Sequence, residues 1–182
     1  SDLACDLTAK GHEVTVIADR RGYEDRTKTF IAREEWQGIK VERVWSTQFG
    51  KSRIRFRVID ATAFFFSLFW KLIVTPPQDL VISFTSPPLI GFLGTLFCKL
   101  KGGRSVQWLM DINPDSAIAV GYLKKNGLIA RSLNAVFDFT LRASSFIVVL
   151  DRWMKRKVID HGAATEKVVI AAPWSVFVPE KT

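Results

Sequence analysis

The sequence predicts a doubly wound parallel α/β sheet flanked by helices, from two observations. Stretches whose apolar residues recur at helical spacing alternate with short runs of β-forming residues along the 182-residue chain. The later runs are apolar almost without interruption, as in VISF at 81–84 and IVVL at 147–150, which is typical of strands buried on both faces of a parallel sheet. No internal repeat or low-complexity segment is present.

The first half of the chain predicts two helices and two strands. Leu3, Ala4 and Leu7 have helical spacing, and Gly11 ends that helix. The run HEVTVIAD (12–19) predicts a strand, residues 20–28 a basic loop, and IKVERVW (39–45) a second strand because its apolar and polar residues alternate. Residues 51–74 predict one long helix that Pro76 and Pro77 stop.

The second half repeats a strand-and-helix pattern. Strands are expected at 79–85, 104–110, 145–150 and 167–172. Helices are expected at 88–100, opened by Pro87 or Pro88, from about Asn126-Gly127 to Ser144, and at 152–161. Pro114 is placed to start a further helix.

The order of elements begins on a helix, whereas doubly wound domains normally begin with a strand and a glycine-bearing turn. The usual first strand is therefore missing from the predicted order. The motifs G-x-G-x-x-G, G-x-x-x-x-G-K-[ST] and G-x-S-x-G are all absent from the sequence. Dinucleotide-binding, P-loop and α/β-hydrolase functions consequently have no motif support.

Composition narrows the class of protein and its partners. Apolar residues make up 48% of the chain, which excludes a disordered protein, and two cysteines exclude a disulfide scaffold. We expect Cys5 and Cys98 to be buried free thiols. The N-terminal residues carry acids and no apolar signal region, which favours the cytoplasm. A net charge of +8 indicates an anionic partner: nucleic acid, a membrane surface or a phosphorylated ligand.

The predicted helix at 51–74 is basic at its start and aromatic at its end. Its most apolar stretch, 61–74, is too short to span a membrane, which takes about 20 residues. Cations followed by aromatic residues favour a helix lying on an anionic membrane, and a core helix with a solvated basic end is the alternative. The membrane-contact candidates are Lys51, Arg53, Arg55, Arg57, Phe65, Phe69 and Trp70. Nucleic-acid binding would fit the charge, but the sequence has no module signature for it.

Three strand ends carry polar residues where ligands bind in open parallel sheets. Thr85 and Ser86 could hold a hydroxyl-rich or anionic ligand, or they could cap the next helix. Asp111 could act as a base or accept from a sugar hydroxyl. Arg152 could reach a phosphate or be one more solvated cation, while Asp151 could cap the following helix.

Other polar residues are weaker candidates. Asp115 fits the first turn of a helix, where the helix dipole favours a carboxylate. A turn role is expected for His12, and His161 is expected at a helix C-terminus. No cluster of His and Cys has metal-binding spacing, so no metal site is expected.

Four segments in order resemble the N-terminal half of family 4 glycosyltransferases of the GT-B fold. They are KGHEVTVIAD (10–19), TSPPLIGFLG (85–94), DINPDSAIAVGYLKK (111–125) and SFIVVLDRWMKRKVIDHGAATEKVVIAAPW (145–174). The likeness is greatest to bacterial enzymes that build exopolysaccharide, O-antigen or colanic-acid-type glycans, and it spans nearly all of residues 3–176. Asn113 stands where that family commonly has Trp.

The resemblance implies a Rossmann-like acceptor-side domain over 1–172, the start of an interdomain linker at 173–182, and a donor domain outside this sequence. The implied reaction transfers a sugar from a nucleotide-sugar to an acceptor hydroxyl without a metal or other cofactor. The implied catalytic residue is Asp111, and the acceptor-binding residues are Thr85, Ser86, Asn113, Asp115 and Arg152. The implied partners are a glycan or polyprenyl-diphosphate-linked acceptor, an anionic membrane surface and the chain's own C-terminal domain, with no nucleic acid. The expected location is the inner face of the cytoplasmic membrane. The alternatives are a non-catalytic membrane-docking subunit and a basic nucleic-acid-binding module.

Overall fold

A computed structural model describes residues 2–22, 28–47, 49, 54–112, 121, 124 and 127–171. The chain divides into two compact units, Ser1–Thr75 and Pro76–Thr182, and each is described by itself. Both units are α/β, and the second contains a parallel four-stranded sheet, so the predicted fold class is confirmed.

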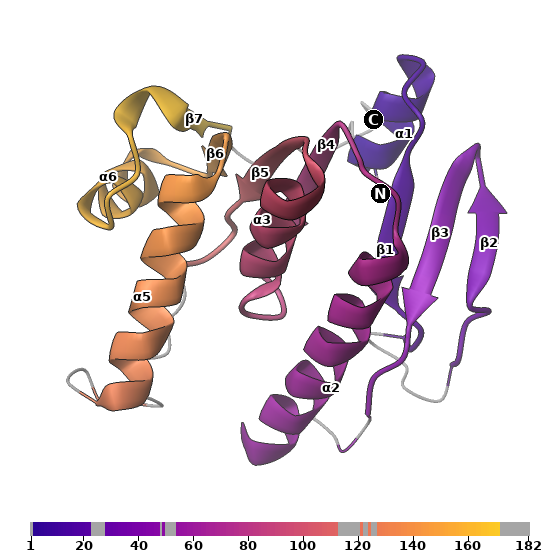
Figure 1. The fold of residues 1–182 in the computed structure, drawn as a ribbon, viewed down its shortest axis with the longest axis horizontal. Coiled ribbons are helices and arrows are strands. Elements are labelled where there is room, and N and C mark those ends of the chain that lie inside the picture. The colour runs from indigo at the N-terminus through magenta and orange to yellow at the C-terminus, as the bar shows by residue number, and fades with distance from the viewer. Residues whose placement is uncertain are drawn as a thin grey trace, which may run out of the picture. The chain divides into compact units, whose positions relative to one another are not determined.

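The described residues of the first unit form a three-stranded sheet and the helices α1 and α2 (Figure 1). The order β1-β3-β2 places β3 in the centre, parallel to β1 and antiparallel to β2. The elements are α1 (Asp2–Ala9), β1 (Thr15–Asp19), β2 (Arg33–Trp36), β3 (Ile39–Val44) and α2 (Ile54–Val74).

Strand β2 was not predicted, and its sequence REEW explains why. It is a short, charged edge strand, so it has no continuous apolar run. A two-residue turn at Gln37 and Gly38 connects it to β3, and both residues have positive φ, 51° and 76°. Hairpin turns of this length require that conformation, which glycine adopts without steric cost.

Helix α2 rests on the sheet of the first unit through one face. Phe64 and Leu68 are buried, and Lys71 Nζ lies 2.6 Å from Glu42 Oε2 on β3. In the second turn of the helix, Asp60 Oδ1 accepts from Thr47 Oγ1 at 2.8 Å and from the Phe49 amide at 3.0 Å. These contacts fix which side of α2 faces away from the sheet.

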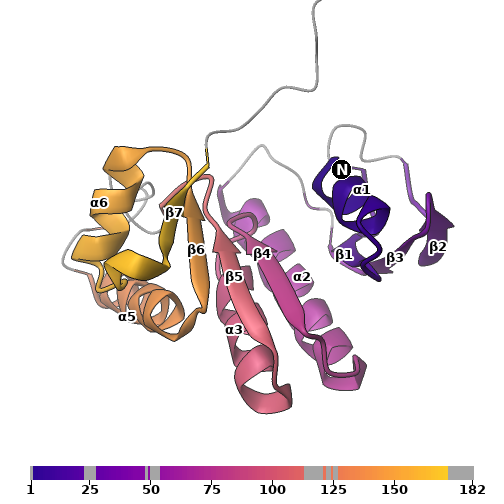
Figure 2. The same ribbon diagram turned by 90° about the horizontal axis from the view of Figure 1, so that it is seen from above.

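The second unit is a run of strand–helix–strand crossovers in which all four strands are parallel, in the order β4-β5-β6-β7. Figure 2 shows helices α5 and α6 on the same side of β6 and β7. The elements are β4 (Leu80–Phe84), α3 (Ile90–Lys101), β5 (Arg104–Trp108), α5 (Leu128–Ala143), β6 (Phe146–Val149), α6 (Arg152–Asp160), a 3-10 turn at Thr165–Lys167 and β7 (Val168–Ile170).

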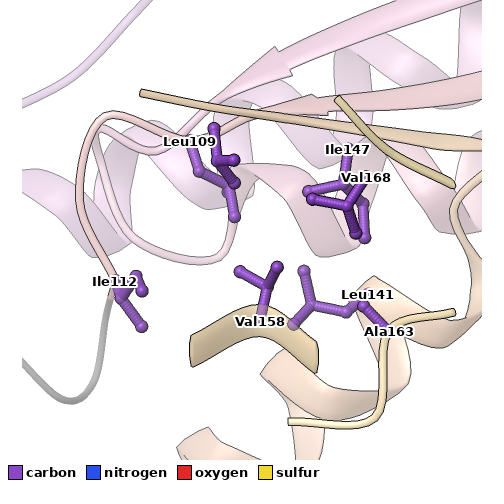
Figure 3. Close-up of a cluster of buried hydrophobic side chains, with 8 residues drawn as sticks. Leu109, Ile112, Leu141, Ile147, Val158, Ala163 and Val168 are labelled. Atoms are coloured by element: carbon purple, nitrogen blue, oxygen red, sulfur yellow. The ribbon is translucent and has the colours of Figure 1, made fainter. Parts of the chain in front are cut away.

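The core of the second unit lies between α5, α6 and the sheet (Figure 3). Leu141 of α5, Ile147 and Val149 of β6 and Val158 of α6 are all 0% exposed. Burying a side chain of this size contributes about 1.5–3 kcal/mol. This cluster therefore fixes α6, and with it the residues that follow β6, against the sheet.

Helix α3 approaches the sheet closely because small residues line the contact. A Cβ on Gly94 would lie 2.2 Å from Ser83 Oγ, and one on Gly91 would lie 2.1 Å from Gln107 Oε1. Gln107 Nε2 donates to Thr95 Oγ1 at 3.0 Å, and Thr95 Oγ1 lies 3.3 Å from Ser144 Oγ. Buried polar groups thus have partners where α3, β5 and the end of α5 meet.

The predicted start of α3 is wrong. Neither Pro87 nor Pro88 opens the helix, because it begins at Ile90 after Leu89, whose φ is 71°. The prolines lie in the preceding turn. Of the predicted buried thiols, Cys98 is buried, and burial raises its pKa. Cys5 is half-buried, with Sγ 3.3 Å from Gln37 Oε1.

Candidate functional site

The carboxyl ends of the four parallel strands lie at one edge of the second unit's sheet. Phe84, Trp108, Val148 and Val169 are aligned across β4, β5, β6 and β7. The residues that follow them therefore share this edge, with neighbouring strands about 4.8 Å apart. Ligands of open α/β sheets bind in this position. We call it the carboxyl edge.

Thr85 and Ser86 follow β4 at the carboxyl edge. Thr85 Oγ1 accepts a hydrogen bond from the Met110 amide at 3.3 Å, so it links the ends of β4 and β5. Ser86 is exposed. Neither hydroxyl caps α3, because the N-cap is Leu89 and no side chain bonds to that helix start. The capping alternative for these two residues is therefore wrong.

Asp111 lies three residues beyond Trp108, the last residue of β5, and is exposed. Its neighbour Ile112 is 8% exposed and belongs to the core cluster, which anchors the segment beside Asp111. The structure therefore places an accessible carboxylate at the carboxyl edge. Asn113 and Asp115 lie outside the described residues.

Asp151 and Arg152 follow β6 at the same edge. Asp151 Oδ1 accepts from the amides of Trp153 at 2.7 Å and Met154 at 2.8 Å, so the predicted capping role is confirmed. Arg152 is the exposed first residue of α6, and its guanidinium carbon lies 5.9 Å from the centre of the Trp153 ring. The carboxyl edge thus brings Thr85, Ser86, Asp111 and Arg152 together on neighbouring strand ends.

The first unit has a polar strand end that the sequence interpretation did not include. Asp19 ends β1, where Oδ2 accepts from Ser46 Oγ at 2.5 Å and Oδ1 from the Arg21 amide at 3.0 Å. Ser46 is buried. The signal that singled out Asp111, a carboxylate directly after an apolar strand, is also present at Asp19.

The membrane-contact candidates differ in how far their side chains are exposed, and two of them lie outside the part of the chain that the structure describes. Lys51 and Arg53 lie outside the described residues, while Arg55 and Arg57 are exposed at the start of α2. Phe65 and Phe69 are half-buried, whereas Trp70 is 65% exposed. The exposed apolar side chains of α2 lie on one face of the helix when successive residues are turned by about 100°, and we call them the α2 stripe: Val58, Ile59, Phe66, Trp70, Ile73 and Val74.

The histidines contact neighbouring turns and helices rather than one another. His161 Nδ1 lies 2.7 Å from Asp138 Oδ1, which joins the end of α6 to α5. His12 is exposed beside Gly11, whose φ is 87°. Within the described ranges, no three His, Cys, Asp or Glu residues lie where they could hold a metal ion. The same part of the chain contains no helix with the length and apolar character needed to cross a membrane.

Comparison with known proteins identifies the family of this chain. The glycosyl transferase 4-like domain family matches residues 1–174. The chain is 30% identical over 97 residues to WcaI of Escherichia coli (strain K12), which is named as a colanic acid biosynthesis glycosyl transferase. It is 26% identical over 97 residues to WbjE of Pseudomonas aeruginosa, which is named as a glycosyltransferase.

The two similarities cover 48% and 53% of this chain but 24% of each relative, so the chain matches about a quarter of those proteins. The family match covers most of the chain and includes both units and the carboxyl edge. The chain belongs to the glycosyl transferase 4-like domain family.

Proposed function

We propose that this chain forms the acceptor-binding half of a glycosyltransferase that moves a sugar from a nucleotide-sugar to a lipid-linked glycan acceptor. The acceptor is a polyprenyl-diphosphate-linked sugar, and the reaction belongs to the synthesis of cell-surface polysaccharide. A second domain outside residues 1–182 binds most of the nucleotide-sugar. The proposal includes no metal or other cofactor and no nucleic-acid partner.

The observation that carries this proposal is the set of groups at the carboxyl edge: the hydroxyls of Thr85 and Ser86, the exposed carboxylate of Asp111 and the exposed guanidinium of Arg152. A sugar acceptor offers hydroxyls and, when it is lipid-linked, a diphosphate. Thr85 and Ser86 suit the hydroxyls, and Arg152 suits the phosphate because its planar guanidinium pairs with two oxygens at once. Asn113 and Asp115 are proposed as further acceptor contacts.

Asp111 has the proposed catalytic role. The acceptor hydroxyl attacks the anomeric carbon of the donor sugar, and the bond from that carbon to the nucleoside diphosphate breaks. The hydroxyl proton passes to the Asp111 carboxylate as the new bond forms, and the nucleoside diphosphate leaves with the electron pair. A carboxylate at the edge can serve as this general base if it lies within hydrogen-bond reach of the hydroxyl.

The test is release of nucleoside diphosphate from a panel of nucleotide-sugars by the whole protein, with and without polyprenyl-diphosphate-linked sugars. We expect release that depends on the acceptor. Residues 1–182 expressed alone should bind acceptor or membrane and release none. Release by residues 1–182 alone would contradict the half-enzyme proposal, and no release by the whole protein with any pair would contradict the transferase proposal.

The α2 stripe supports the proposed association with the inner face of the membrane. A helix lying in the interface needs an exposed apolar face and cations that reach anionic headgroups. Helix α2 has six exposed apolar side chains on one face, with the exposed Arg55 and Arg57 in its first turn. Each such cation near an anionic surface contributes about 1 kcal/mol.

Trp70→Glu should weaken binding of the protein to phosphatidylglycerol-containing vesicles by at least about tenfold, as measured by co-sedimentation. The change removes a 65% exposed indole from the stripe. It also introduces a negative charge, which the anionic lipid repels. The matched control is Trp36→Glu on β2, which is 47% exposed and lies outside the stripe. Equal losses in the two variants, or none in Trp70→Glu, would refute a membrane role for the stripe.

A further inference from the structure

We propose that Trp153 is a stacking platform for a pyranose ring of the acceptor, and that Arg152 beside it binds the attached phosphate. This inference rests on the proposed function, because it divides the recognition of a sugar phosphate between two side chains of the carboxyl edge.

Trp153 is unusually exposed for its residue type. At 67% it is the most exposed tryptophan in the described part of the chain, above Trp36, Trp45 and Trp70. Tryptophan is highly buried on average, because its side chain carries a large apolar area. An indole left in solvent where ligands bind in this fold class is therefore available for contact with a ligand.

The backbone that carries the indole is held in place. Asp151 Oδ1 accepts from the Trp153 amide at 2.7 Å and from the Met154 amide at 2.8 Å, which fixes the first turn of α6. Met154 packs against the core cluster, and Val158, one turn later on the same helix face, is 0% exposed. A platform on an anchored helix loses little freedom when a ligand binds, and this favours affinity.

Arg152 places a positive charge next to the indole of Trp153. Its guanidinium carbon lies 5.9 Å from the Trp153 ring centre, within the range of a cation–π contact. The next cation, Lys155, donates from Nζ to the Val168 carbonyl at 3.0 Å and so contacts β7. Arg152 is the cation that contacts the indole at the helix start.

The pair matches the chemistry of a sugar phosphate. One face of a pyranose ring presents C–H groups that pack on a flat aromatic surface. A phosphate on the anomeric oxygen would then meet the guanidinium, which pairs with phosphate oxygens in a fixed geometry. Thr85, Ser86 and Asp111 lie at the ends of β4 and β5 on the same edge, where the sugar hydroxyls would extend.

The experiment uses the whole protein labelled with 5-fluorotryptophan and followed by fluorine NMR. The probes are glucose 1-phosphate, galactose 1-phosphate and N-acetylglucosamine 1-phosphate, with inorganic pyrophosphate as the sugar-free ligand. The Trp153 resonance is assigned by its loss in Trp153→Phe. At least one sugar phosphate should shift that resonance, and pyrophosphate should leave it in place.

The variants separate the two contacts. Trp153→Ala should raise the Kd of the sugar phosphate at least about fivefold and leave that of pyrophosphate unchanged, because stacking of one ring is worth a factor of this order. Trp153→Phe should recover part of the loss, and Arg152→Ala should weaken both ligands. Trp36→Ala, an exposed tryptophan near the amino end of β3, is the matched control and should change neither.

Unchanged sugar-phosphate binding in Trp153→Ala, an equal loss in Trp36→Ala, or no binding of any sugar phosphate by the unmodified protein would each overturn the inference. The transfer assay gives a separate result. Acceptor-dependent release of nucleoside diphosphate together with unchanged binding in Trp153→Ala would reject the platform and keep the transferase. Stacking of a sugar phosphate on Trp153 without any sugar transfer would keep the platform and reject the transferase.

Discussion

Replacing Asp111 with asparagine should lower kcat for sugar transfer by at least about 100-fold, the lower end of what a general base contributes. The amide keeps the size of the side chain and its place at the carboxyl edge, but it cannot take the proton of the acceptor hydroxyl. The KM for the nucleotide-sugar should change little, because the proposed donor site lies in another domain. Initial rates of nucleoside diphosphate release at saturating donor and acceptor measure the effect.

The matched control is Asp79→Asn. Asp79 is an exposed aspartate directly before β4, at the opposite end of the strand from Thr85. Its variant removes the same charge from the same unit, so an equal fall in kcat would point to net charge rather than to a base. The unfolding temperature of each variant is measured beside kcat, so that a loss of folded protein is not counted as the loss of a base. A kcat within about twofold of the unmodified value would remove Asp111 from the proposed mechanism.

The strands of the second unit were predictable because their pattern is strong and local. The run SFIVVL could only be a buried strand or a helix fragment, and its length with β-branched residues favoured a strand. The structure has β6 at Phe146–Val149, one residue inside each predicted boundary. By contrast, β2 depends on tertiary pairing with β3, and its four residues carry three charges. A pattern based on apolar residues could not find it.

The location of the candidate site was predictable, but the use of each side chain was not. Strand ends follow from the strands, so Asp111 and Arg152 could be placed at one edge from the sequence. The bond from the Met110 amide to Thr85 Oγ1 joins residues 25 apart in the chain. Such a contact depends on the register of β4 against β5, which no spacing in the sequence specifies.

The exposure of individual side chains on α2 also could not be predicted from the sequence. Phe64, Phe65 and Phe66 are consecutive, so they point about 100° apart around the helix and meet three environments. Phe64 is buried, Phe65 is half-buried and Phe66 is 56% exposed. The sequence therefore predicted an aromatic helix. It could not show that Phe65 and Phe69, which were predicted as membrane contacts, are half-buried, because that depends on how α2 packs. Phe66 and Trp70 are exposed, so substitutions at these two residues test vesicle binding more directly than substitutions at Phe65 and Phe69.

Leu141→Ala should lower the free energy of unfolding by about 2–5 kcal/mol, as expected when a buried leucine is truncated and leaves a cavity. Leu141 is 0% exposed and lies in the cluster with Ile147 and Val158, which joins α5 and α6 to the sheet (Figure 3). Urea unfolding followed by far-UV circular dichroism measures the change.

Leu128→Ala is the matched control, because Leu128 begins the same helix and is 80% exposed. Leucine and alanine both favour helices, so this change should stay within about 0.5 kcal/mol. Equal losses in the two variants would show that helix propensity, and not the core, determines the stability of this unit. The same core holds the start of α6, so Leu141→Ala should also broaden the fluorine resonance of Trp153. A loosened helix samples more positions, and the stacking surface would lose the fixed orientation that favours sugar binding.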